Sequence, residues 1–237
     1  MFGRSVPDER PRYPFTGFKL AQAVLSADGQ RSGFAGLSIG AGRVYRVTAK
    51  ASCVWNARHA PPKRRCGCGF YCLSTLTEAR ALSCATDNRA AVLLEVVASG
   101  HFIRYERGLR YSRQRVRAVR VGPCRCGRPA NGLVDAGSGL VGWRFLAGAC
   151  VVCTADRPYI TFGEFAACLD QPVPVGTDTG IGAYAGAMMM PSVLSPGEPA
   201  PSSSVAVLMA EVALVQARLD DLQVRAARFY GDADGTP

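Results

Sequence analysis

Histidine and lysine are scarce in this 237-residue chain, which has two histidines and only three lysines among its 28 basic residues. It lacks an apolar run of the roughly 18 residues that a membrane-spanning helix needs. It also lacks a glycine-rich loop ending in Gly-Lys-Ser/Thr, the phosphate cradle of P-loop proteins. Because histidine is the commonest acid–base group, acid–base catalysis has little to work with. We therefore expect no membrane interaction, assign no catalytic residue, and leave enzymatic activity uncertain but disfavoured.

The first 18 residues have no basic start, apolar stretch and small-residue cleavage site of the kind that directs secretion. We therefore expect a cytoplasmic, reducing setting. In such a setting the ten cysteines are better interpreted as metal ligands than as disulfide partners.

The clearest metal-ligand pattern is a pair of cysteine pairs, Cys124 with Cys126 and Cys150 with Cys153. Two close pairs separated by a hairpin-sized insert are how a zinc ribbon presents four thiolates tetrahedrally. The Cys-x-Cys spacing of the first pair is tighter than the usual Cys-x-x-Cys. Four reduced cysteines that merely lie close in sequence remain an alternative. A redox pair at Cys150 and Cys153 is disfavoured because no strand-to-helix setting follows it.

A second candidate site combines Cys53, His59, Cys66 and Cys68 within sixteen positions. Three thiols and an imidazole match the ligand set of a closed structural zinc site. The alternative is that His59 is a solvated loop residue and that Cys72 completes the set. The sequence thus predicts about two zinc ions per chain.

The residues around this second site resemble a group of uncharacterised actinobacterial proteins. The similarity runs through Cys53, Trp55, His59-Ala60-Pro61 and Cys66-Gly67-Cys68-Gly69-Phe70-Tyr71, and continues in Val92–Val96, Gly100, Ile103, Glu106-Arg107-Gly108 and Arg110. Those proteins carry a Cys…His-x-x-Pro…C-x-CG-x-YA segment and often a second, ribbon-like cysteine module. The resemblance covers about residues 44–121 and departs from the family pattern at Cys72. It implies the ligand set above and a bacterial cytoplasmic setting. It implies no activity.

Basic charge is concentrated in the first part of the chain. Residues 1–128 hold 23 Lys and Arg against 7 Asp and Glu, whereas residues 129–237 hold 5 against 11. The densest stretch supplies the predicted nucleic-acid-binding residues Arg104, Arg107, Arg110, Arg113, Arg115, Arg117 and Arg120. The alternation of the middle three predicts a strand with its arginines on one face, and Phe102, Tyr105 and Tyr111 are candidates to stack on bases. The alternative is a solvated face.

The expected fold is α+β with a mainly β core, two zinc-braced loop modules and a C-terminal coiled-coil helix. We expect a flexible arm over 1–17, a strand-rich core with the first cluster over 18–122, a zinc-ribbon-like module over 123–170, and a linker over 171–204. Within the core, residues 91–98 and 102–105 are expected to form a hairpin around Gly100, and residues 109–121 a further strand. Short helices are expected over 77–84 and 161–169, the latter with the capping-box pair Thr161 and Glu164.

Residues 205–230 carry apolar side chains at alternating three- and four-residue steps, the pattern of an association helix. The sequence therefore predicts a homodimer, or a partner helix, through residues 205–229; a helix folded back onto its own core is the alternative.

These patterns predict a structural-zinc binding protein that is nucleic-acid-associated or regulatory and that meets DNA or RNA through an arginine-rich sheet face. An adaptor that docks an acidic protein is the second hypothesis, and a zinc or thiol enzyme is the third.

Overall fold

The computed structural model describes residues 13–37, 42–53, 55, 59–85, 88–154 and 158–180. The chain divides into two compact units, Met1–Pro191 and Ser192–Pro237, and the described residues all belong to the first. The predicted coiled coil over 205–230 lies outside the described residues.

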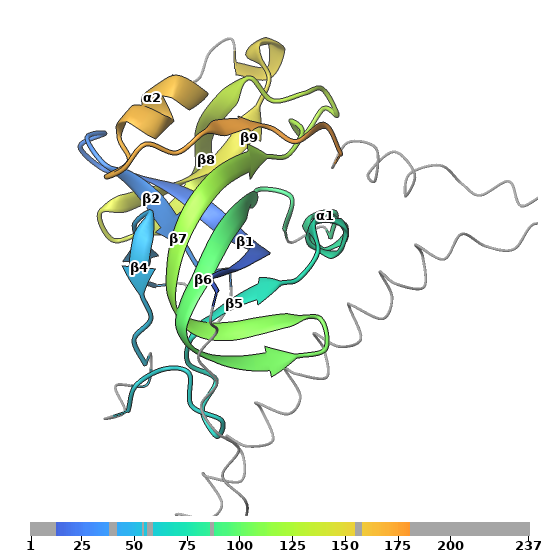
Figure 1. Ribbon diagram of the computed structural model, residues 1–237. Coiled ribbons are helices and arrows are strands. Elements are labelled where there is room, and N and C mark those ends of the chain that lie inside the picture. The colour runs from blue at the N-terminus through green and yellow to red at the C-terminus, as the bar shows by residue number, and fades with distance from the viewer. Residues whose placement is uncertain are drawn as a thin grey trace, which may run out of the picture. The chain divides into compact units, whose positions relative to one another are not determined.

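The described part is mainly β, as the sequence predicts, with two short α-helices (Figure 1). Its strands are β1 (Phe15–Ser26), β2 (Ser32–Ala35), β3 (Val44–Tyr45), β4 (Thr48–Lys50), β5 (Phe70–Leu73), β6 (Val92–Tyr105), β7 (Gly108–Val121), β8 (Gly132–Leu140), β9 (Trp143–Ala149), β10 (Tyr159–Thr161) and β11 (Val175–Thr177). The helices are α1 (Leu76–Ser83) and α2 (Phe162–Ala167), with a 3-10 turn over Val151–Thr154. Within these residues, no helix has the length and apolar character needed to cross a membrane.

One long strand, β1, joins two sheets. Its first half pairs with β6, from Phe15 opposite Ala98 to Ala21 opposite Val92. Its second half pairs with β2 and β9. In the first sheet, β6 pairs with β7, and the other side of β7 pairs with β4, β5 and β11. In the second sheet, β9 pairs with β8, and β8 pairs with β10. Strands from 18–122 and from 123–170 therefore share one pairing network.

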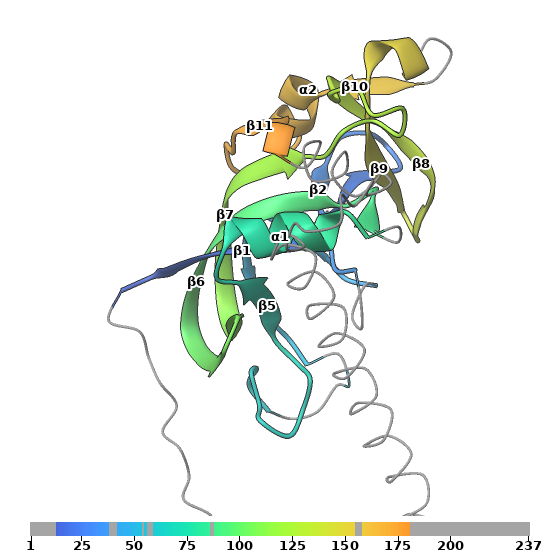
Figure 2. The same ribbon diagram turned by 90° about the vertical axis from the view of Figure 1, so that its right-hand side faces the viewer.

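The main core lies between these strands because alternate residues of each turn apolar side chains to the same side. Val92, Leu94 and Val96 of β6 meet Leu133 of β8 and Phe165 of α2 there. A smaller cluster forms where α1 covers the other face of β1 and β6, as Figure 2 shows, and Leu20 and Leu93 are buried beneath it.

Both predicted helices are present. In α2, Thr161 accepts from the backbone N–H of Glu164 while the Glu164 carboxylate accepts from that of Thr161, so the predicted capping box is confirmed. In α1 the cap is Thr75, and the helix begins at Leu76, one residue before the expected start.

The prediction of a hairpin around Gly100 is wrong. β6 runs unbroken through Gly100 to Tyr105, and the true turn is Glu106-Arg107, which leads into β7. Gly100 has a φ of +79° and lies at a shift in register, so the glycine marks a bulge instead of a turn.

One partly buried lysine packs beside the main core. The Lys19 ammonium is 4.9 Å from the centre of the Tyr45 ring and 4.8 Å from that of Phe70. Burial lowers the pKa of Lys19 from 10.5 to about 8, and a small Coulombic contribution from Cys72 opposes this shift.

Candidate metal centres and basic surface

The structure brings each predicted ligand set together. In both groups, Cys53 with His59, Cys66 and Cys68, and Cys124 with Cys126, Cys150 and Cys153, the four ligand atoms lie within 4.8 Å of one another. Cys72 is not part of the first set; it is buried in the main core on β5, which removes the alternative that it replaces His59.

The distances within each set fit one tetrahedral ion. Zinc–thiolate bonds of about 2.3 Å place two sulfurs of a tetrahedron about 3.8 Å apart. The Cys53 and Cys66 sulfurs are 3.8 Å apart, and those of Cys126 and Cys150 are 3.6 Å apart. His59 Nε2 lies 3.2 Å from the Cys68 sulfur. These separations are far from the roughly 2.05 Å of a disulfide. Both sets can therefore hold a metal ion with four protein ligands.

The second set lies at the end of β7 and at the end of β9. Cys124 follows β7, and its carbonyl accepts from the Gly127 N–H at 2.8 Å, in a turn that Gly127 permits with a φ of +84°. Cys150 follows β9 and opens the 3-10 turn, in which the Cys153 N–H bonds the Cys150 carbonyl at 3.0 Å. The β8–β9 hairpin is the insert expected between the two pairs.

Backbone N–H groups favour the thiolate form of Cys126 and Cys150 in this second set, because they lower the pKa of both. Above all, the backbone N–H of Arg128 lowers the pKa of Cys126 to about 6. The pKa of Cys153 is raised to about 12, first of all by Cys126, because the neighbouring sulfurs compete for negative charge. Four thiolates this close repel one another unless a cation lies among them. The chemistry of the donors thus agrees with the geometry.

The first set is held in a long loop between β4 and β5 (teal in Figure 1). Cys53 and Cys68 are buried, and His59 and Cys66 are partly exposed. Burial raises the pKa of the Cys68 thiol to about 11. A bound cation would offset the cost of ionising this thiol.

Arg110 of β7 braces this loop. The side chain is only 4% exposed, and its guanidinium donates to the Cys66 carbonyl at 2.5 Å and to the Lys63 carbonyl at 3.0 Å. Arg110 was expected on the nucleic-acid-binding face. Its position under the metal loop instead makes it a contact between β7 and the first metal site.

The other predicted arginines divide into two groups. Arg113, Arg115 and Arg117 are exposed, alternate with buried Gln114 and Val116, and form no ion pair within the described residues. By contrast, Arg120 lies 3.4 Å from the Glu95 carboxylate, and Arg107 lies 3.9 Å from that of Glu78. Arg104 is exposed near the end of β6, beside Phe102.

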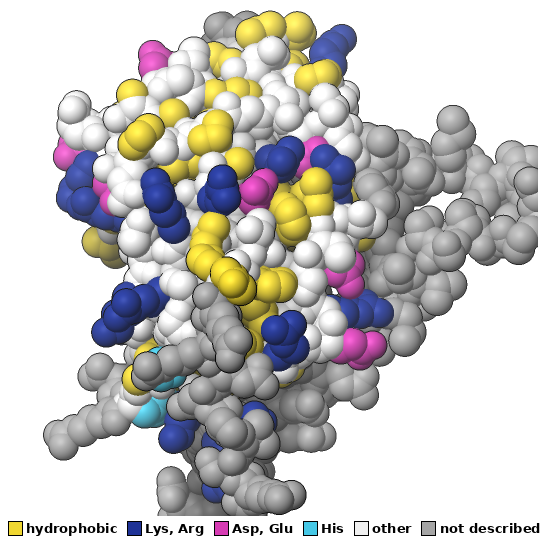
Figure 3. Space-filling view, in the orientation of Figure 1, with side chains coloured by type: hydrophobic (Ala, Val, Ile, Leu, Met, Phe, Trp, Pro, Cys, Tyr) yellow, Lys and Arg dark blue, Asp and Glu magenta, His cyan; other side chains and the backbone are white. Residues whose placement is uncertain are grey.

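The neighbouring strand adds to the exposed group. Lys50 of β4 lies directly opposite Arg113, and Thr48 lies opposite Arg115. We call Lys50, Arg113, Arg115 and Arg117 the basic strip. Figure 3 shows Lys and Arg side chains spread over one face of the described part of the chain, with hydrophobic side chains between them.

The three aromatic side chains predicted to stack on bases differ in their exposure. Tyr111 and Phe102 are buried in the core, so neither can stack on a base; Tyr105 is half exposed. The sequence reasoning missed Tyr71 of β5, which is equally exposed. The only feature of the sequence that could have indicated an exposed ring near the metal site was the position of Tyr71 directly after Cys68-Gly69-Phe70.

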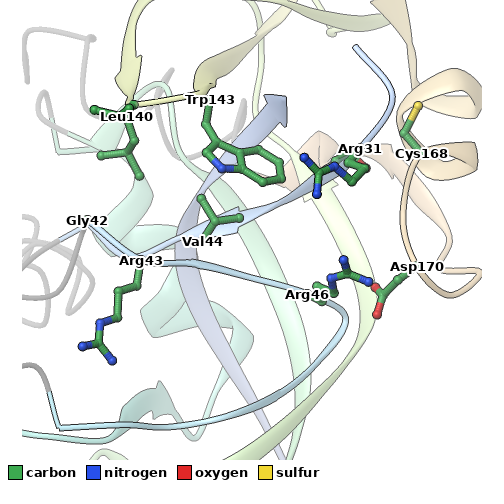
Figure 4. Close-up of a pocket in the computed structure, with 11 residues that line it drawn as sticks. Arg31, Gly42, Arg43, Val44, Arg46, Leu140, Trp143, Cys168 and Asp170 are labelled. Atoms are coloured by element: carbon green, nitrogen blue, oxygen red, sulfur yellow. The ribbon is translucent and has the colours of Figure 1, made fainter. Parts of the chain in front are cut away.

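A separate open hollow of about 700 Å³ lies beside β3 and the β8–β9 turn. Arg31, Arg43 and Arg46 line it together with Trp143, and Arg31 lies 5.6 Å from the centre of the Trp143 ring. Figure 4 shows Arg46 pointing toward Asp170 and Arg43 pointing away from the other side chains. The hollow adds basic charge to the described unit outside the strip.

No known protein family, curated protein or solved structure matches this chain, and its function must be argued from these sites.

Proposed function

We propose that this protein binds DNA or RNA through the basic strip, and that two structural zinc ions hold the loops at the two ends of β7. The first loop contacts β7 at Arg110, and the second begins at Cys124, three residues beyond the end of β7. Each candidate site offers four protein ligands, enough to fill the coordination of a tetrahedral zinc ion without water, which favours structural over catalytic zinc.

The observation that carries the proposal is the juxtaposition of Lys50 and Arg113. Like charges directly opposite each other on neighbouring strands are destabilising. Arg115 and Arg117 extend this charge, and within the described residues no carboxylate pairs with any member of the strip. A phosphate between these side chains would relieve the repulsion.

The spacing of the strip also suits a polyanion. Alternate residues of a strand are about 7 Å apart. Three arginines at this interval can meet successive phosphates of one nucleic-acid strand. The strip consists of basic side chains, which suit phosphate contacts, so this binding is expected to depend on phosphate and on salt instead of on base sequence.

The test compares two triple variants of equal charge. Arg113→Glu/Arg115→Glu/Arg117→Glu alters the strip, whereas Arg31→Glu/Arg43→Glu/Arg89→Glu alters exposed arginines elsewhere; each changes the net charge from +10 to +4, because each substitution contributes −2. Binding to a labelled duplex and to a labelled single strand is measured by fluorescence anisotropy over a range of salt concentrations.

We expect the strip variant to bind more weakly and to lose about two to three units of slope in log K against log salt, whereas the control keeps most of its slope. Equal slopes for both variants would refute a specific role for the strip. Failure of the unmodified chain to bind either nucleic acid would favour the acidic-protein adaptor instead.

A further inference from the structure

Two half-exposed tyrosines lie beside the first metal loop. Tyr71 of β5 and the Tyr105 residue at the end of β6 are each 49% exposed. The Arg110 guanidinium lies 5.7 Å from the centre of the Tyr71 ring and 5.9 Å from that of Tyr105. The two rings are therefore brought together around one buried cation, although 34 positions separate them in sequence.

The metal loop fixes the Tyr71 ring. The Tyr71 hydroxyl donates to the Gly67 carbonyl at 2.9 Å, and Arg110 donates to the same hydroxyl at 3.3 Å. Gly67 lies between the ligands Cys66 and Cys68. A ring tied at its hydroxyl and packed over a guanidinium loses little further freedom when a ligand stacks on it.

The same loop presents a tight basic turn. The Cys66 N–H bonds the Lys63 carbonyl at 3.0 Å, which places Arg64 and Arg65 at the corner. Lys63, Arg64 and Arg65 are all exposed. Arg104 adds a further exposed basic group, and the exposed Glu106 is the single acid from position 104 to 110.

Exposed aromatic rings beside mobile basic side chains are the combination that binds unpaired nucleotides, because bases stack on the rings while phosphates meet the cations. In a duplex the base faces are covered by their neighbours and cannot reach such rings. We infer that Tyr71 and Tyr105, with the basic turn Lys63–Cys66, form a stacking platform for single-stranded nucleic acid. This inference rests on the proposed function and specifies its ligand as single-stranded.

The test replaces each ring with an aliphatic side chain in the full, metal-loaded chain. Tyr105→Leu removes the aromatic face, and Tyr105→Phe is its matched control; no hydrogen bond of the Tyr105 hydroxyl is found in the described part of the chain, so neither change breaks one. Tyr71→Leu and Tyr71→Phe form the second pair. The probes are a labelled oligothymidylate and a labelled duplex of equal length, and zinc content is measured for every variant.

We expect Tyr105→Leu to bind the oligothymidylate about tenfold more weakly and Tyr105→Phe to bind it within about twofold of the unmodified chain. Tyr71→Phe loses the two hydrogen bonds of the hydroxyl, so the comparison at that position is with Tyr71→Leu, which is expected to bind about tenfold more weakly than Tyr71→Phe. Duplex binding is expected to be unchanged in all four variants. Leu variants that hold their zinc and bind oligothymidylate normally would overturn the platform but leave the basic strip standing. A Leu variant that loses duplex binding equally would also overturn it. Absence of binding to both probes by the unmodified chain would overturn the proposed function as well.

Discussion

Arg110 offers the sharpest test of how the first metal site is supported. Arg110→Met removes two charge-assisted hydrogen bonds to the carbonyls of Lys63 and Cys66, one of which belongs to a ligand. Hydrogen bonds to charged groups contribute about 1.5–3 kcal/mol, and loss of a group that supports metal ligands commonly weakens metal binding about 10–100-fold. Because about 1.4 kcal/mol corresponds to a tenfold change, one such bond is equivalent to about 10–100-fold, so the expected loss corresponds to the bond that Arg110 donates to the ligand residue Cys66.

We expect Arg110→Met to weaken zinc binding at the first site about 10–100-fold and to leave the second site unchanged. Arg113→Met is the matched control on the same strand, since Arg113 is exposed and its side chain forms no hydrogen bond or ion pair with the described residues of either metal loop. Competition with a chromophoric chelator measures the two affinities. Cobalt(II) absorption identifies the sites, because one offers three sulfurs and a nitrogen and the other offers four sulfurs. Equal affinities for both variants, or equal losses at both sites, would refute the reasoning.

Three further predictions follow from the described features. Protein purified without added metal should contain about two zinc ions per chain by elemental analysis. Cys126→Ser should lower the soluble yield because metal binding and folding are coupled. Protein that contains no metal and whose thiols all titrate would contradict the prediction of both metal sites. The pKa of Lys19 is about 8 in the folded chain and 10.5 in the unfolded chain. The charged lysine therefore destabilises the fold fully below pH 8, and this destabilisation is lost as the pH rises from about 8 to 10.5. Lys19→Met should therefore raise the free energy of unfolding by up to about 3 kcal/mol at pH 7 and by much less at pH 10, as measured by urea titration; a gain that does not vary with pH would contradict this cause. Finally, light scattering should show a dimer for the full chain and a monomer for a chain ending at Ser204, since residues 205–229 carry the heptad pattern; equal monomer masses would show that this helix is buried within one chain.

The ligands could be predicted from sequence because their chemistry is local. Cys124 and Cys126, or Cys66 and Cys68, are so close in the chain that few backbone conformations separate their sulfurs. The alternation of Arg113, Arg115 and Arg117 is likewise a property of one strand, and the burial of Gln114 and Val116 between them follows the same period.

Long-range contacts were beyond such reasoning. Arg110 continues the arginine pattern of its neighbours, and its burial is explained by the carbonyls of Cys66 and Lys63, 44 and 47 positions earlier in the chain. Tyr111 and Tyr71 have the same side chain, yet one fills the core and the other faces solvent. Which face of each strand is covered depends on how β5, β6 and β7 pair, and no local pattern contains that information.

The way β1 joins the two sheets also constrains how the chain is made. Residues 23–26 of β1 pair with residues 143–146 of β9, so the second half of β1 is not fully paired until those residues, more than a hundred positions later, have left the ribosome. Contacts so distant in sequence close slowly, and until then the backbone edge of β1 is open to pairing with other chains. A nascent chain or fragment ending near residue 122 would carry that open edge without β8 and β9. Expression of partial chains should therefore favour aggregation over a stable half-molecule.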